Sequence, residues 1–140
     1  MNRTTRYLAP IAAVAMLTGC GLKEKFRDAD GAVTRFHAAL DAERYQAIWD
    51  MTGAQMRAAA KQSDFELLLR AIHRKLGKVT ATKQVGWNAN AGTAGSTVTL
   101  TMDTTFARGS GTETFVYAKG ADQRLQLAGY SINSQQMMLN

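Results

Sequence analysis

The spacing of apolar residues changes near Lys78, and this change limits the possible folds more than any other feature of the chain. Before it, apolar residues recur every three to four positions, which is typical of amphipathic helices. After it, apolar and polar residues alternate, which is typical of strands with one buried face. The sequence therefore predicts an α+β domain, with N-terminal helices packed on a curved four-stranded antiparallel sheet.

Four helical stretches are predicted ahead of Lys78. Asp41 is the expected N-cap of the second, and Gly53 ends it. Ser63 and Glu66 form a predicted capping box at the start of the fourth, and Gly77 ends that helix. The four predicted ranges are 28–40, 42–51, 54–61 and 63–76.

Four strands are predicted after Lys78, at 79–87, 97–106, 112–118 and 124–132. A polar, glycine-rich turn is expected at 88–95. The last strand changes phase, which predicts a bulge near Ala128 and Gly129. The second strand alternates most strictly, with one apolar face and one polar face. The polar face consists of Thr97, Thr99, Thr101, Asp103 and Thr105. It suits either a solvated surface or contact with a second protein.

The first 19 residues have the layout of an export signal. Arg3 and Arg6 precede the apolar run 8–17, which is shorter than the roughly 20 residues that cross a bilayer. The following Leu17-Thr18-Gly19-Cys20 resembles the lipobox of bacterial lipoproteins. This resemblance predicts cleavage before Cys20, acylation of its thiol, and a lipidated tether over 20–27 that leads into a single domain over 28–140. Gly21, in place of the Asp that retains lipoproteins in the inner membrane, favours the outer membrane, with the domain facing the periplasm.

The charge and the cysteine count narrow the class of protein. Removal of Arg3 and Arg6 lowers the formal charge from +6 to +4. The remaining basic residues are interleaved with acids and form no basic-aromatic motif, so nucleic acid is not an expected partner. Cys20 is the sole cysteine, so the mature domain has no disulfide and depends on its buried core.

Four segments carry a resemblance to a known family: 45–49, 65–77, 112–115 and 127–130. They resemble small exported domains of the domain-of-unknown-function family 4019. The order of helices and strands is similar to the nuclear-transport-factor-2-like, or cystatin-like, cone fold. The resemblance implies this fold and an exported location, and it implies no activity.

Few residues are candidates for chemistry. His37 and His73 lack the spacing of a metal site, so we expect structural or surface roles and neither a metal nor a cofactor. Enzymes that share the cone fold place an acid or histidine base and a tyrosine inside the cone, which directs attention to Asp103, Tyr117 and Tyr130. Asp103 lies on the polar strand face, away from the helices, so no catalytic residue is predicted. The aromatic residues serve either as core or as a pocket lining. They are Phe36, Tyr45, Trp49, Phe65, Trp87, Phe106 and Tyr130.

Three functions remain open. The leading hypothesis is a membrane-anchored, non-catalytic module of the cell envelope that binds an envelope protein, a small ligand or a second copy of itself. The second is a periplasmic inhibitor or immunity lipoprotein directed against a toxin or a wall-degrading enzyme, with 88–95 as the inhibitory loop. The third is a small enzyme of the ketosteroid-isomerase type.

Overall fold

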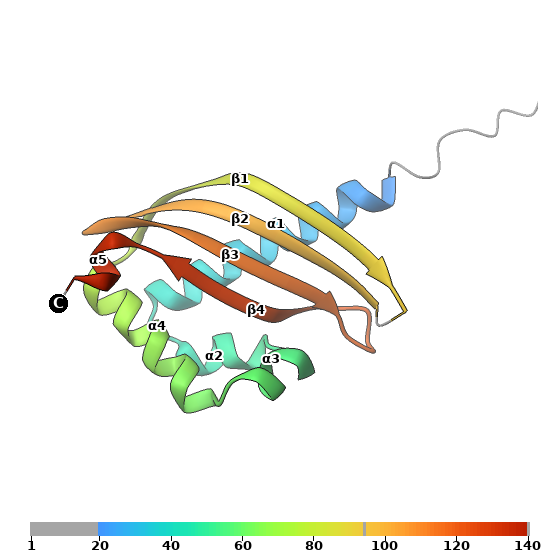
Figure 1. Cartoon of the computed structure of the whole chain (residues 1–140), viewed down its shortest axis with the longest axis horizontal. Coiled ribbons are helices and arrows are strands. Elements are labelled where there is room, and N and C mark those ends of the chain that lie inside the picture. Colours follow the sequence, from blue (N-terminus) through green and yellow to red (C-terminus); the bar gives the residue numbers. More distant parts are fainter. Residues whose placement is uncertain (1–19, 94, 140) are drawn as a thin grey trace, which may run out of the picture.

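The computed structural model describes residues 20–93 and 95–139. Four helices precede a four-stranded antiparallel sheet, so the predicted α+β class is confirmed (Figure 1). The elements are α1 (Cys20–Asp41), α2 (Tyr45–Asp50), α3 (Ala54–Ala59), α4 (Gln62–Leu76), β1 (Val79–Gly92), β2 (Gly95–Phe106), β3 (Gly109–Lys119), β4 (Leu125–Asn133) and α5 (Gln135–Met138). The short α5 was not predicted. The expected signal at 1–19 lies outside the described residues.

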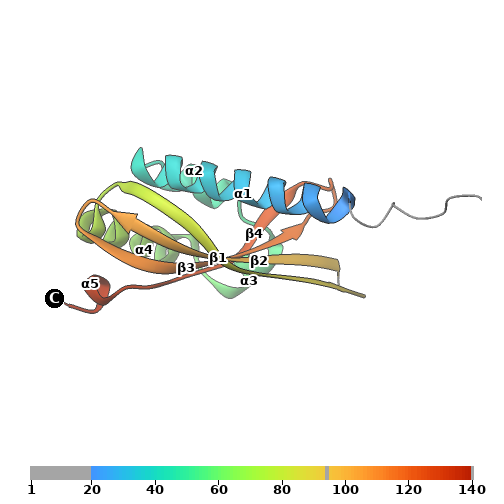
Figure 2. The same cartoon turned by 90° about the horizontal axis from the view of Figure 1, so that it is seen from above.

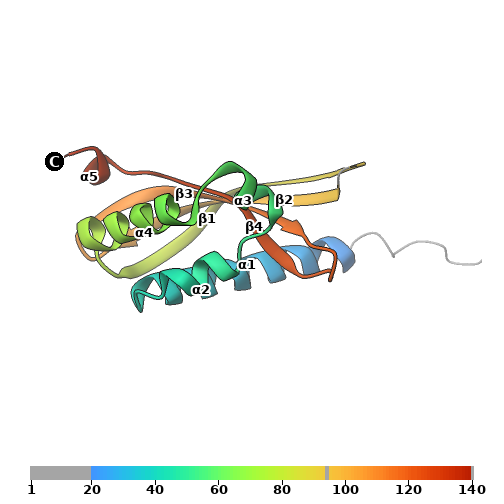
Figure 3. The same cartoon turned by 90° about the horizontal axis from the view of Figure 1, so that it is seen from below.

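The sheet is a meander in the order β1-β2-β3-β4. It is curved, and α1 runs along one of its faces (Figures 2 and 3). On β2 the side chains that face the helices are all buried: Val98, Leu100, Met102, Thr104 and Phe106. The alternate side chains point the other way, with Thr97, Thr99 and Thr101 half-buried and Asp103 and Thr105 exposed.

Helix α1 is longer than predicted. It begins at Cys20, so the segment 20–27, expected as a tether, is the first part of the helix instead. Phe26 packs edge-on against Trp87 of β1 with 4.5 Å between ring centroids, and Ala29 is fully buried. These contacts extend the apolar stripe of α1 towards its N-terminus and explain why the helix continues there.

The predicted turn at 88–95 is also wrong. Asn88 to Gly92 pair with Thr99 to Gly95, so most of this segment is strand. Its asparagines and glycines indicated a loop because they have no apolar face. Backbone pairing to β2 holds the segment extended without one.

Two predicted helix caps are absent, whereas the predicted helix end at Gly77 and the predicted bulge near Gly129 are confirmed. Asp41 ends α1 and accepts a hydrogen bond from the backbone of Val79. Helix α4 begins at Gln62 after Lys61, with no side-chain cap from Ser63. Gly77 does end α4, with a positive φ of 79° that suits glycine. The register of β3 and β4 shifts between Val116 and Tyr117, so Ala128 of β4 is the extra residue of the predicted bulge.

The core lies between the helices and the inner face of the sheet. Phe36, Tyr45, Phe65 and Phe106 are buried in it. Trp49 and Tyr130 are half-buried at its edge, and Trp87 is 56% exposed. The aromatic set is therefore mainly core.

Candidate functional site

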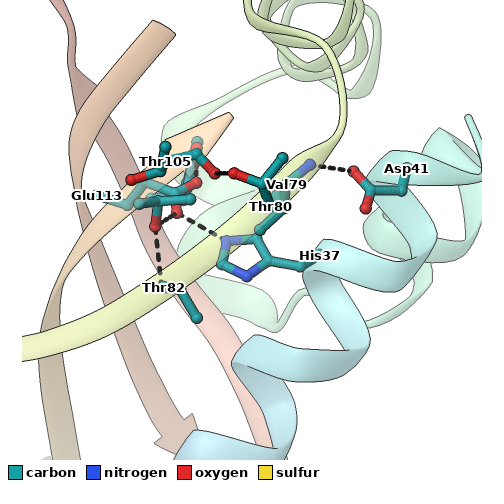
Figure 4. Close-up of polar contacts among 9 residues, drawn as sticks. His37, Asp41, Val79, Thr80, Thr82, Thr105 and Glu113 are labelled. Atoms are coloured by element: carbon teal, nitrogen blue, oxygen red, sulfur yellow. Dashed lines mark hydrogen bonds and ion pairs between the residues drawn. The ribbon is translucent and has the colours of Figure 1, made fainter. Parts of the chain in front are cut away.

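A buried carboxylate lies at the centre of the sheet's inner face. Glu113 on β3 is fully buried and accepts three hydrogen bonds. His37 Nε2 lies 2.7 Å from Oε2, Thr104 Oγ1 donates to the same oxygen at 2.6 Å, and Tyr130 OH donates to Oε1 at 2.7 Å. Thr82 Oγ1 lies 3.0 Å from Thr104 Oγ1 and donates to it, because the Thr104 hydrogen is already used. Figure 4 shows the side chains of Glu113 and His37 pointing towards each other, with a dashed line for their contact.

Strand alternation brings these side chains together. Glu113, Phe115 and Tyr117 are alternate residues of β3, and all three point towards the helices. Thr104 on β2 and Tyr130 on β4 extend the same inner face on either side. His37 comes from the C-terminal part of α1, so one carboxylate links a helix to three strands.

Burial and charge keep the tyrosine of this cluster neutral. Desolvation raises the pKa of Tyr130 well above its ordinary value of 10.0, and the nearby charge of Glu113 raises it further. Tyr130 therefore remains a hydrogen-bond donor to Glu113 at all physiological pH values. A donor of this kind is what a buried carboxylate requires.

The polar groups of this cluster pair with one another. None of the five main clefts along residues 20–93 and 95–139 is lined by His37, Glu113 or Tyr130. The hydrogen bonds of the cluster hold α1 in one position on the sheet, since a buried network stabilises only when its members are satisfied.

The residues considered for chemistry from the sequence occupy different places. Asp103 is exposed on the outer sheet face and accepts a hydrogen bond from Thr112 at 3.0 Å. His73 lies 3.3 Å from the exposed Glu43, far from the carboxylate cluster in sequence and fold. Glu113 was missed. Its position in the alternating run 112–115 placed it on the face of Phe115, and that was the available signal.

A cleft of about 660 Å³ opens between α1, the end of α2 and the β3–β4 hairpin. Figures 2 and 3 both show the start of α1 beside this hairpin. The apolar part of the cleft is lined by Ala32, Phe36, Met51, Leu125 and Leu127. Charged and polar side chains surround it: Arg27, Asp28, Arg35, Asp50, Tyr117, Asp122, Gln123, Arg124 and Gln126. A volume of this size is typical of small-molecule sites.

A second groove lies at the end of α4, but two of its three arginines are occupied. Arg70 lies over the Tyr45 ring at 4.7 Å from the centroid. Arg108 donates to the carbonyl oxygens of His73 and Arg74 and so caps α4. These groups serve the fold, which makes the cleft beside α1 the better candidate site.

Two further properties concern metals and membranes. Across 20–93 and 95–139, no group of three or more His, Cys, Asp or Glu side chains is arranged to hold a metal ion. No helix in that part of the chain is both long and apolar enough to cross a membrane.

Comparison with known proteins gives one family. No curated protein matches the chain. A family model described as "Protein of unknown function (DUF4019)" matches residues 32–130, which include α2 to α4, β1 to β3, the first part of β4 and the buried carboxylate. Because this match covers well over half of the chain, the protein belongs to the DUF4019 family.

Proposed function

We propose that this protein is an exported lipoprotein, anchored to a membrane through Cys20, whose domain is a non-catalytic binding module of the cell envelope. The single observation that carries the binding role is the cleft between α1 and the β3–β4 hairpin. Its apolar floor and polar rim are the usual features of a ligand site. We further propose that the helices and curved sheet belong to the nuclear-transport-factor-2-like class of cone folds.

The position of the cleft is consistent with such an anchor. Arg27, on its rim, follows Cys20 by two turns of α1, which corresponds to about 10 Å along the helix axis. Acylation of Cys20 would therefore hold the cleft close to the headgroups of the outer membrane's inner leaflet.

The arrangement of Glu113 favours a binding module over an enzyme. General acid–base catalysis requires a side chain that can reach its substrate. Glu113 is fully buried, and its hydrogen bonds go to His37, Thr104 and Tyr130. An enzyme of the ketosteroid-isomerase type remains the second candidate, because an enclosed acid facing a tyrosine is the pairing that such chemistry needs.

The outer face of the sheet is a second candidate interaction surface, and we propose a second copy of the chain as its partner. Thr99 and Thr101 are half-buried, and Thr97 borders a small hollow that it shares with Ala54 and Gln55 of α3. Removing threonine hydroxyls from water costs less than removing charges, so a nearly uncharged face suits sheet-to-sheet contact.

Anchoring is tested by Cys20→Ser. The wild-type chain should incorporate labelled fatty acid and fractionate with the outer membrane. Cys20→Ser should lose the label and accumulate uncleaved or soluble, since each buried CH₂ contributes about 0.8 kcal/mol to lipid anchoring. Unlabelled wild-type protein would refute the anchor, and labelled protein in the inner membrane would refute only the outer-membrane assignment.

Ligand binding is tested by filling the cleft. A Cβ at Gly31 would meet only Arg35 Nη1, at an ordinary 3.5 Å, and the rest of a leucine side chain would extend from it beside the cleft, so Gly31→Leu should fold. Loss of a helical glycine should even stabilise α1 by about 0.5–1 kcal/mol. Molecules that co-purify with the wild-type protein, identified by mass spectrometry, should be lost from Gly31→Leu. They should be retained in Ala38→Leu, which adds the same side chain to the exposed side of α1. Equal retention in both variants would exclude the cleft.

A further inference from the structure

We infer that the cleft takes an anionic amphiphile, with its acidic head on Arg35 and Tyr117 and its apolar part on the floor between α1 and β4. This inference rests on the proposed binding function and specifies its ligand class. The acidic head is a carboxylate or a phosphate. Its source is either a free amphiphile or the headgroup of a membrane lipid.

Three arginines and three aspartates line the cleft, and among the described residues Arg27, Arg35 and Asp28 have no ion pair. Asp50 accepts a hydrogen bond from Gln46 at 2.9 Å. Asp122 accepts one from the backbone of Arg124 and lies 3.8 Å from its guanidinium. Among the described residues, by contrast, neither Arg27 nor Arg35 has an ion pair within 4.0 Å. A free guanidinium presents paired N–H donors that match a carboxylate or a phosphate.

Tyr117 adds a neutral donor beside Arg35. The residue is only 4% exposed, yet it lines the cleft, and no hydrogen bond in the described part of the chain uses its hydroxyl. Desolvation raises the pKa of this hydroxyl, while the positive charge of Arg35 acts on it in the opposite direction. The hydroxyl therefore stays protonated within electrostatic reach of the guanidinium. One cation and one O–H donor together form an anion site.

The apolar floor adjoins this pair. Ala32 and Phe36 are neighbours of Arg35 on α1, and Leu127 is a near neighbour of Tyr117 across the β3–β4 pairing. A ligand whose head lies on Arg35 and Tyr117 would place an adjoining apolar group on these side chains. Ala32, Phe36 and Leu127 are buried, so a free inorganic anion would leave Met51 and Leu125, the half-buried members of the floor, in water. An amphiphile covers both parts of the cleft.

The test uses the full-length chain in its membranes and two photoreactive probes of equal chain length. One is a diazirine fatty acid, and the other is the corresponding uncharged alcohol. The acid should crosslink to the half-buried floor residues Met51 or Leu125 about tenfold more than the alcohol. Arg35→Gln and Tyr117→Phe should each reduce this labelling several-fold, and Arg35→Lys should restore part of it. Arg74→Gln removes the same charge from the groove at the end of α4 and should leave labelling unchanged.

Competition identifies the source of the acidic head. Excess laurate displaces the probe if the ligand is a free amphiphile, and short-chain phosphatidylglycerol displaces it if the ligand is a lipid headgroup. Equal labelling of the cleft by acid and alcohol would overturn the inference while leaving a binding cleft in place. Absence of labelling in the cleft by either probe would overturn both the inference and the proposed binding role.

Discussion

At the scale of single residues, Glu113 is the one acidic or basic side chain, apart from the histidines, that is buried in the described part of the chain. A carboxylate without partners in an apolar interior is strongly unfavourable, and this one is fully buried. Its three donors come from α1, β2 and β4, so the cost is offset only when these elements are correctly placed. The cluster thus favours one arrangement of α1 on the sheet over others.

Two replacements of Glu113 should separate the contribution of side-chain shape to stability from the contribution of hydrogen bonding. Glu113→Leu leaves His37, Thr104 and Tyr130 without their acceptor and should lower the free energy of unfolding by about 3–5 kcal/mol. Glu113→Gln keeps the shape and one acceptor oxygen, and should cost about 1–2 kcal/mol. Urea denaturation gives both values. Asp103→Asn, an exposed change on the neighbouring strand, is the control and should cost little. A Glu113→Leu variant as stable as wild type would show that the network does not stabilise the fold.

The buried tyrosines should make the protein sensitive to alkaline pH. In the folded state Tyr130 has a pKa well above 10.0, whereas in the unfolded chain it ionises near that value. Above pH 10, unfolding therefore releases a proton, and the free energy of unfolding falls as pH rises. At each pH the slope should be reduced in Tyr130→Phe, by up to about one proton, or about 1.4 kcal/mol per pH unit. Identical slopes in the two proteins would place the ionisation elsewhere.

The sequence could predict much of the core at this scale, but not the polar cluster. Strand alternation assigns Val98, Leu100 and Met102 to the buried face without knowledge of the fold. His37 was expected as an isolated structural or surface residue because its partner, Glu113, is 76 positions away in sequence. A single sequence carries no signal for such a pairing. Only the position of Glu113 on an apolar strand face hinted at its burial.

At the scale of elements, the existence and order of the helices and strands could be predicted, and their ends could not. The first part of α1 contains Lys23, Glu24 and Lys25, which suggested a polar tether. Contact between Phe26 and Trp87 extends the helix instead. The expected cap at Asp41 is absent because its carboxylate accepts a hydrogen bond from the backbone of Val79. Helix α4 begins at Gln62, so Ser63 lies inside the helix and not at its N-cap. Tertiary contacts account for the start of α1 and for the role of Asp41.

The stability of the domain should depend less on Trp49 of α2 than it would if this ring were fully buried. Trp49 is half-buried, with its ring 6.1 Å from that of Phe65 and the guanidinium of Arg57 at 5.4 Å. Trp49→Ala should therefore cost about 2 kcal/mol, below the 3–5 kcal/mol of a fully buried ring. Thermal and urea unfolding measure the change. Trp87→Ala is the matched control at an exposed site and should cost about 1 kcal/mol, since it loses mainly the contact with Phe26. A larger loss at Trp87 than at Trp49 would contradict this ranking.

At the scale of the whole molecule, the cleft beside α1 and the outer face of the sheet are different parts of the surface. The start of α1 and the β3–β4 hairpin, which border the cleft, lie at one end, and α5 lies at the other (Figure 1). Thr99 and Thr101, in the middle of the outer sheet face, do not line the cleft, whereas Thr97 lies near α3 and Asp103 and Thr105 lie near α5. An anchored protein of this shape could hold its cleft near the bilayer while its sheet remains available to another protein. Ligand binding and self-association can therefore be tested independently.

Self-association through the sheet should be abolished by opposite charges on the outer face. Thr99 and Thr101 lie side by side on β2, and both point away from the core, so Thr99→Lys and Thr101→Glu made together should leave the fold intact. Burying these charges between two sheets would be unfavourable, so any dimer seen by analytical ultracentrifugation should become a monomer. The Gly31→Leu variant changes the cleft alone and should dimerise as wild type does. Unfolding of the double variant would mean that the outer face is needed for stability. A folded double variant that still dimerises would show that these threonines form only a solvated surface.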